Sequence, residues 1–138
     1  MRTKIIFSTA IAACSLIATA TSFAQMAAPE GVKTTKVGDA MVFVDSKGMT
    51  LYTYDRDTTA DKSSCNDRCA TAWPPLVAGA DAMKMGSWSV VTRDDGTKQW
   101  AYKGKPLYTY AKDTAPGDAK GDGVGPQGTH IWHAAKAE

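Results

Sequence analysis

The stretch Leu51–Thr58, LYTYDRDT, decides the fold because the chain contains it twice. Leu107–Thr114 reads LYTYAKDT and is identical to it at six of eight positions. The two copies lie 56 residues apart, and Lys47-Gly48 matches Lys103-Gly104 at the same offset. A solenoid needs about three or more repeats. Two copies in a chain of 138 residues therefore indicate two units of one domain, related by pseudo-symmetry.

Each copy lies in a region with the composition of β-hairpins. Residues 41–44 and 49–54 are β-rich runs separated by a turn-like tetrapeptide, and residues 99–102 and 106–110 repeat this arrangement. A further strand over 88–92 returns through Asp95-Gly96, a strong hairpin-turn signal. We therefore expect an all-β fold, a small single domain of tandem β-hairpin repeats that is sandwich- or barrel-like. Residues 58–72 contain few strand formers, so one short helical turn is predicted near the cysteines.

The N-terminus has the composition of a secretory signal peptide. Arg2 and Lys4 precede an uncharged apolar run over residues 5–20, and small residues lead up to Ala24. The run is shorter than the roughly 20 residues that span a bilayer. We expect export, cleavage near Ala24 and a periplasmic or secreted mature chain without a transmembrane segment. In an alternative, Ile11–Cys14 acts as a lipobox and Cys14 carries a lipid, but the apolar run continues past this cysteine.

Cleavage divides the chain into a signal peptide (1–24), a flexible leader (25–36) and a single β domain (37–138). The two repeats then cover about 37–76 and 88–135. Cleavage also removes Cys14 and leaves Cys65 and Cys69. Two cysteines in an exported chain predict a disulfide.

Charge and motif content narrow the class of protein. The formal net charge is +2, from 16 Lys and Arg against 14 Asp and Glu. A nucleic-acid-binding protein would carry a strong basic surplus, so no nucleic-acid partner is expected. The sequence contains no nucleophile elbow, Gly-rich phosphate loop or HExxH motif. We expect a protein that is not an enzyme and has no cofactor.

The repeated motif supplies the first candidate site, and two interpretations of it stay open. In one, Asp57 and Asp113 bind a ligand beside an aromatic platform. In the other, each aspartate caps the turn after its strand, because Asp side chains accept backbone N–H bonds in turns. The motif residues are Tyr52, Tyr54, Asp57, Tyr108, Tyr110 and Asp113.

A metal site is the second candidate. Cys65 and Cys69 have a spacing compatible with zinc or copper, although a redox pair more often has about two intervening residues. His130 and His133 are the only histidines, and Met83 and Met85 add soft ligands that favour copper. These residues suggest a periplasmic copper or haem carrier as an alternative to a binding module.

The motif residues carry a family resemblance. Tyr52 to Asp57 and Tyr108 to Asp113 fit the pattern Y-x4-D, or Yx(F/W/Y)xxD, of the secreted-repeat lipoprotein family. Trp73–Leu76 and Trp132-His133 are also similar to that family. The resemblance implies bacterial export, often as a lipoprotein, and tandem repeats of unknown function. It supplies no catalytic residues. The resulting hypothesis is an exported, non-catalytic module that binds a small ligand or an envelope protein.

Overall fold

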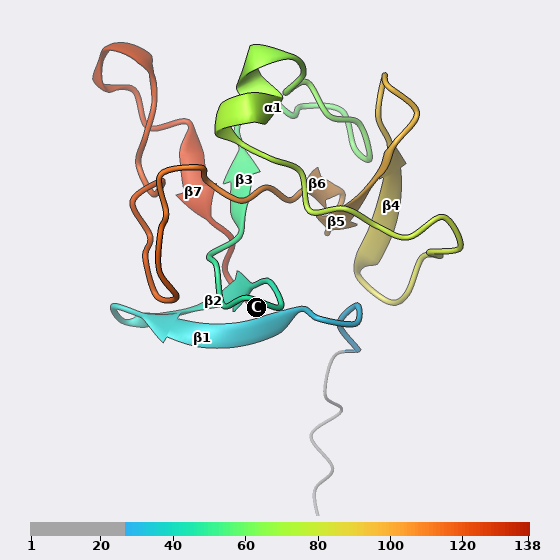
Figure 1. Cartoon of the computed structure of the whole chain (residues 1–138), viewed down its shortest axis with the longest axis horizontal. Coiled ribbons are helices and arrows are strands. Elements are labelled where there is room, and N and C mark those ends of the chain that lie inside the picture. Colours follow the sequence, from blue (N-terminus) through green and yellow to red (C-terminus); the bar gives the residue numbers. More distant parts are fainter. Residues whose placement is uncertain (1–26) are drawn as a thin grey trace, which may run out of the picture.

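The computed structural model describes residues 27–138. The predicted signal peptide, with Cys14, lies outside the described residues. The elements follow in the order β1 (Lys33–Val37), β2 (Ala40–Val44), β3 (Tyr52–Tyr54), α1 (Arg68–Ala72), β4 (Trp88–Thr92), β5 (Lys98–Tyr102), β6 (Lys105–Pro106), a 3-10 turn η1 (Pro126–Gly128) and β7 (Trp132–Ala134) (Figure 1). The predicted all-β fold with one short helix near the cysteines is confirmed.

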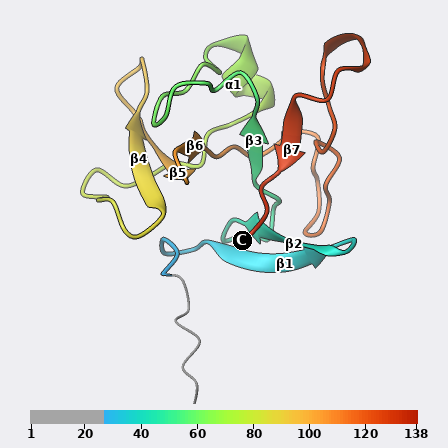
Figure 2. The same ribbon diagram turned by 180° about the vertical axis from the view of Figure 1, so that it is seen from behind.

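The strands form three small antiparallel sheets, β1-β2, β3-β7 and β4-β5-β6. In both views the β1-β2 hairpin lies crosswise below the ends of β3 and β7 (Figures 1 and 2). The turn from β4 to β5 contains Gly96 at φ +84°, a conformation that glycine adopts at little cost. The carboxylate of Asp95 accepts the Thr97 N–H there at 2.9 Å, which explains the strong turn signal in the sequence.

The two repeats are interlocked. Tyr52 and Tyr108 pair across the centre of the molecule through two backbone hydrogen bonds of 2.7 and 3.0 Å. β3 of the first repeat pairs with β7 of the second. In the equivalent contact of the other repeat, Thr109 of the second repeat donates its N–H to the Pro74 carbonyl of the first at 2.8 Å. Each motif strand is therefore completed by a segment from the other repeat.

The side-chain alternation of the motif strands divides the core in two. Leu51 and Leu107 lie in one cluster, and Tyr52 and Tyr108 lie in the other; all four are fully buried. The first cluster also contains Phe43, Trp88, Tyr102 and Ala135. The second also contains Cys65, Trp73 and Trp132.

The prediction of a flexible leader over 25–36 is wrong for residues 33–36, which lie in β1. β1 begins at Lys33, and the half-buried Val32 packs against the first core cluster. The strand sequence KTTKV is largely polar because β1 is exposed along much of its length and pairs only with β2. It therefore lacks the apolar alternation by which strands are recognised in a sequence.

Candidate ligand-binding site

The tyrosine and the aspartate of each motif bond across the two repeats. The Tyr108 hydroxyl of the second copy donates to Asp57 Oδ2 of the first at 2.7 Å. The Tyr52 hydroxyl of the first copy donates to Asp113 Oδ2 of the second at 2.5 Å. The tyrosine and the aspartate of one Y-x4-D motif therefore do not bond to each other; each bonds to the other copy of the motif. We call this pair of contacts the Tyr–Asp clasp.

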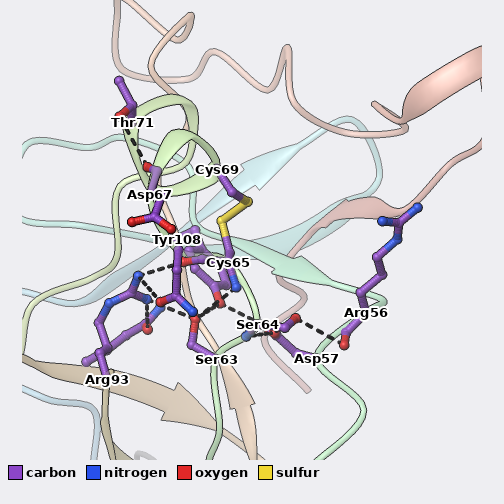
Figure 3. The surroundings of a disulfide bond; sticks show 12 residues. Arg56, Asp57, Ser63, Ser64, Cys65, Asp67, Cys69, Thr71, Arg93 and Tyr108 are labelled. Carbon is purple, nitrogen blue, oxygen red and sulfur yellow. Dashed lines mark hydrogen bonds between the residues drawn. A yellow bond between two sulfur atoms is a disulfide. The ribbon is translucent and has the colours of Figure 1, made fainter. Parts of the chain in front are cut away.

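The Asp57 half of the clasp extends into a buried polar network beside the disulfide (Figure 3). Asp57 Oδ1 accepts the backbone N–H and the hydroxyl of Ser64 at 2.7 and 2.6 Å. The Tyr108 hydroxyl also lies 2.7 Å from Ser63 Oγ. Arg93 is buried and donates to Ser63 Oγ at 2.9 Å and to the Cys65 carbonyl at 2.6 Å. The network therefore ties the first repeat's loop to the hairpin of the second.

The Asp113 half uses backbone donors instead. Asp113 Oδ1 accepts the Lys120 N–H at 3.0 Å, and the Gly121 N–H donates to the Tyr52 hydroxyl at 3.2 Å. At the repeat offset of 56 residues, Lys120 is the equivalent of Ser64 and Gly121 is the equivalent of Cys65. A Cβ on Gly121 would lie 2.8 Å from ring atoms of Trp73, so this position excludes a side chain.

The clasp keeps both tyrosines protonated. Burial raises the pKa of the Tyr52 hydroxyl well above its usual range, and the hydrogen bond to Asp113 raises it further. Burial also raises the pKa of Tyr108, against the hydrogen bond from Ser63, which lowers it, while Asp57 adds to the rise. A neutral phenol is the form that donates to a carboxylate. Both contacts therefore persist at neutral pH.

The central aromatic of each motif ends a stack of four rings. Tyr54 stacks on Trp132 at 4.1 Å, Trp132 on Trp73 at 3.8 Å, and Trp73 on Tyr110 at 4.0 Å between ring centroids. The two tryptophans are buried, and the two tyrosines at the ends are half-buried. Of the six predicted motif residues, Tyr54 and Tyr110 therefore keep the most accessible surface.

The predicted disulfide joins Cys65 to Cys69. Cys65 is fully buried in the second core cluster, and Cys69 lies in α1. The bond holds the segment that carries Ser63 and Ser64 toward Asp57 and Tyr108 (Figure 3).

The two histidines occupy different surroundings. His133 Nε2 lies 2.9 Å from Asp55 Oδ2, and the exposed His130 lies beside Gly123. Within residues 27–138, no three His, Cys, Asp or Glu side chains are grouped so that they could hold a metal ion. The copper or haem hypothesis stays a prediction that no contact in this part of the chain favours.

An apolar pocket of about 500 Å³ lies over the first core cluster. The core rings of Phe43, Trp88 and Tyr102 lie at its floor, with ring centroids 4.8 to 5.1 Å apart and only 6%, 1% and 6% of each residue exposed. The half-buried Ala28 and Val32 border it. We call it the aromatic pocket; its volume lies within the range of about 300–1,000 Å³ of small-ligand sites.

A second pocket of about 360 Å³ shares Tyr102 and Glu138 with the aromatic pocket. Three exposed lysines line it, Lys103, Lys105 and Lys136. Lys103 Nζ lies 5.4 Å from the centre of the Tyr102 ring. Among the described residues, none of the three forms an ion pair. We call this hollow the lysine pocket.

The sequence indicates the repeated motif but gives no sign of either pocket. Phe43, Trp88 and Tyr102 occupy apolar strand positions, and such positions predict a core without telling which core residues border a cavity. Lys103 lies in the β5–β6 turn, Lys105 begins β6, and Lys136 follows β7. These segments of the second repeat meet because β3 of the first repeat pairs with β7 on one side and with Tyr108, just after β6, on the other.

The architecture defines a class of protein, a duplicated β-hairpin protein whose repeats are interlocked through a Tyr–Asp clasp. Residues 31–77 and 89–136 each match a family described as a secreted repeat of unknown function, and the chain belongs to that family. A search of curated proteins and a search of solved structures each gave no significant match. No helix in residues 27–138 has the length and apolar character needed to cross a membrane.

Proposed function

We propose that this protein is an exported, non-catalytic binding module and that it takes an apolar small molecule into the aromatic pocket. The observation that carries the proposal is the open cavity of about 500 Å³ floored by Phe43, Trp88 and Tyr102. Concave apolar sites with a few polar groups at one side are the usual form of small-ligand sites. The polar groups here are Lys33, Thr34 and Glu138.

The aromatic pocket is a better binding site than the motif itself. Tyr52 and Tyr108 are fully buried, and each aspartate uses one oxygen in the clasp and the other for a neighbouring loop. A ligand at these side chains would have to open the contact between the repeats. Binding in the aromatic pocket leaves the clasp intact. The motif then has a structural role, and the neighbouring hairpins bind the ligand.

Export to the periplasm, with cleavage after Ala24, belongs to the proposal. It is supported by the secreted character of the family and by the signal-peptide composition of residues 1–24. In that compartment the mature chain, beginning at Gln25, would present the aromatic pocket close to its N-terminus, because Ala28 borders the pocket.

Filling the pocket tests the function. N-phenyl-1-naphthylamine, a neutral fluorescent probe, should bind the purified protein with an increase in fluorescence. Ala28→Phe places a ring at the pocket border that takes up volume needed by the probe, and it should weaken binding by about tenfold or more. Ala27→Phe, one residue earlier and outside the pocket lining, is the matched control and should bind as the original protein does. Equal binding by both variants, or no binding to the original protein, would contradict the proposal.

A further inference from the structure

The adjacency of the two pockets points to a chemical class of ligand. Resting on the proposed function, we infer that the protein binds a free, single-chain anionic amphiphile. Its apolar chain lies in the aromatic pocket, and its carboxylate or phosphate head lies in the lysine pocket.

The geometry places a cationic hollow next to an apolar one. Tyr102 borders both pockets, and its hydroxyl donates to the backbone oxygen of Glu138. A ligand that crosses Tyr102 would therefore keep its chain against Val32 and Ala137, above the core rings, and bring its head toward Lys103. Burial of each further methylene adds to the affinity, so even a short chain contributes.

The charges of the lysine pocket favour an anion. Lys103, Lys105 and Lys136 contribute three positive charges. The opposing groups are the carboxylate of Glu138, which lines both pockets, and Asp55, which bonds His133 at the pocket edge. The three ammonium groups are exposed and form no ion pair in the described chain, so they are open to an anionic head. An anionic head would complete their pairing and gain charge-assisted hydrogen bonds.

The pseudo-symmetry of the fold provides an internal comparison. Leu76 and Ala135 occupy equivalent places, because each donates its N–H at 2.8 Å to the leucine that begins a motif, Leu107 and Leu51 respectively. The hollow beside Leu76 has Val77 where the lysine pocket has Lys136.

The acids of that equivalent hollow strengthen the contrast. Glu30 and Asp45 line it, and none of its lining residues is a lysine. The same backbone framework thus carries opposite charge in its two halves. Lys105 and Lys136 therefore differ from their counterparts Met49 and Val77, and a role in binding accounts for their place beside the aromatic pocket. Lys103, by contrast, is shared with the first repeat as Lys47.

Three ligands with one chain and different heads test the inference. Decanoate, decanol and decyltrimethylammonium should be titrated into the purified protein by calorimetry, each below its aggregation concentration. Decanoate should bind about tenfold more tightly than decanol, and the cation should bind most weakly. Added salt should weaken the binding of decanoate and leave that of decanol unchanged, because salt screens exposed charges.

A triple variant separates the head site from the chain site. Lys103→Gln, Lys105→Gln and Lys136→Gln together should bring decanoate affinity down to that of decanol and leave decanol affinity unchanged. The matched control replaces three exposed lysines outside both pockets, Lys47, Lys62 and Lys84, by glutamine. This control keeps the same net charge as the test variant and should retain the preference for decanoate.

The outcomes distinguish the two proposals. Equal affinities for the three ligands, or a preference for the cation, would overturn the anionic class while binding of the neutral naphthylamine probe would still support the pocket. Failure of all four probes would overturn both. Binding to phosphatidylglycerol vesicles without binding of monomeric decanoate would also overturn the inference, because the site would then read a membrane surface.

Discussion

At the residue scale, the Y-x4-D spacing is a consequence of the twofold arrangement of the repeats. Asp57 turns away from its own Tyr52 and meets Tyr108, and Asp113 meets Tyr52. One aspartate in each copy then satisfies one buried hydroxyl in the other copy. Because a buried hydroxyl without a partner is costly, each copy depends on the other for its stability.

A double-mutant cycle should detect the clasp. Asp57→Asn removes the charged acceptor of three hydrogen bonds and should lower the free energy of unfolding by about 2 kcal/mol. Combined with Tyr108→Phe, it should show a coupling energy of about 1 kcal/mol in urea unfolding.

Two controls make this cycle specific. Tyr108→Phe with Asp113→Asn should show a clearly smaller coupling, because these two side chains belong to different halves of the clasp. Asp39→Asn, at an exposed position, should change stability by no more than about 0.5 kcal/mol. Equal coupling of Tyr108 to both aspartates would contradict the crossed pairing.

The buried tyrosines should also make the fold sensitive to alkali. Both folded-state pKa values are raised above the unfolded value of about 10, so the stabilisation is complete below that pH. Above it, the unfolded chain loses phenolic protons that the folded chain retains. Each tyrosine should then lower the free energy of unfolding by about 1.4 kcal/mol per pH unit. Urea unfolding between pH 9 and about 11 measures the slope, and Tyr108→Phe should halve it. A flat profile would contradict burial of the phenols.

At the element scale, the loop after each motif is held against the clasp by a different device in each repeat. In the first repeat, the Cys65–Cys69 disulfide holds the loop that delivers Ser63 and Ser64 to the clasp. In the second, Gly121 fits tightly against Trp73, and its N–H bonds Tyr52. The covalent bond is therefore a feature of one repeat and not of the shared framework.

Removing the disulfide should cost stability in proportion to its short loop. The chain-entropy estimate for a bridge with a sequence separation of four is about 2 kcal/mol. Cys65→Ala with Cys69→Ala should lower the free energy of unfolding by about that amount. The original protein under reducing conditions should match the variant. Unchanged stability in both would contradict a stabilising role for this bond.

The crossed strands predict that neither repeat folds alone. Cleavage between Met83 and Lys84, in the exposed connection before β4, should give two fragments that lack dispersed amide signals when separate. Mixed in equal amounts, they should assemble and recover the native spectrum, because β7 completes β3 and the segment at Pro74 completes the strand at Thr109. A native-like spectrum from either fragment by itself would contradict the interlocked arrangement.

At the scale of the whole molecule, the sequence reveals local structure better than the crossing of the repeats. Apolar alternation and Asp95-Gly96 locate the hairpins, and the cysteine pair predicts the disulfide. Strand β7 is only three residues long, and β1 is polar, so neither carries a periodic signal. The partner of Asp57 lies 51 residues away in the sequence. No local pattern identifies such a partner.

The candidate site was less predictable than the fold for the same reason. The repeated aromatics draw attention to Tyr52 and Tyr108, but their burial assigns them to the contact between the repeats. The aromatic pocket lies between β1, β2, β4, β5 and the segment after β7, and the lysine pocket lies between β3, β5, β6, β7 and that segment. A cavity between separated segments depends on tertiary packing, which no single stretch of sequence encodes.

The most direct measurement of the central claim is a titration of nitrogen-15-labelled protein with decanol, followed through the four tryptophan indole N–H signals. Trp88 floors the aromatic pocket, whereas Trp73 and Trp132 form the centre of the motif stack. We expect the Trp88 signal to shift in a saturable way while the signals of Trp73 and Trp132 stay in place. Saturable shifts of Trp73 and Trp132 with an unmoved Trp88 would place the ligand at the repeated motif and contradict the account.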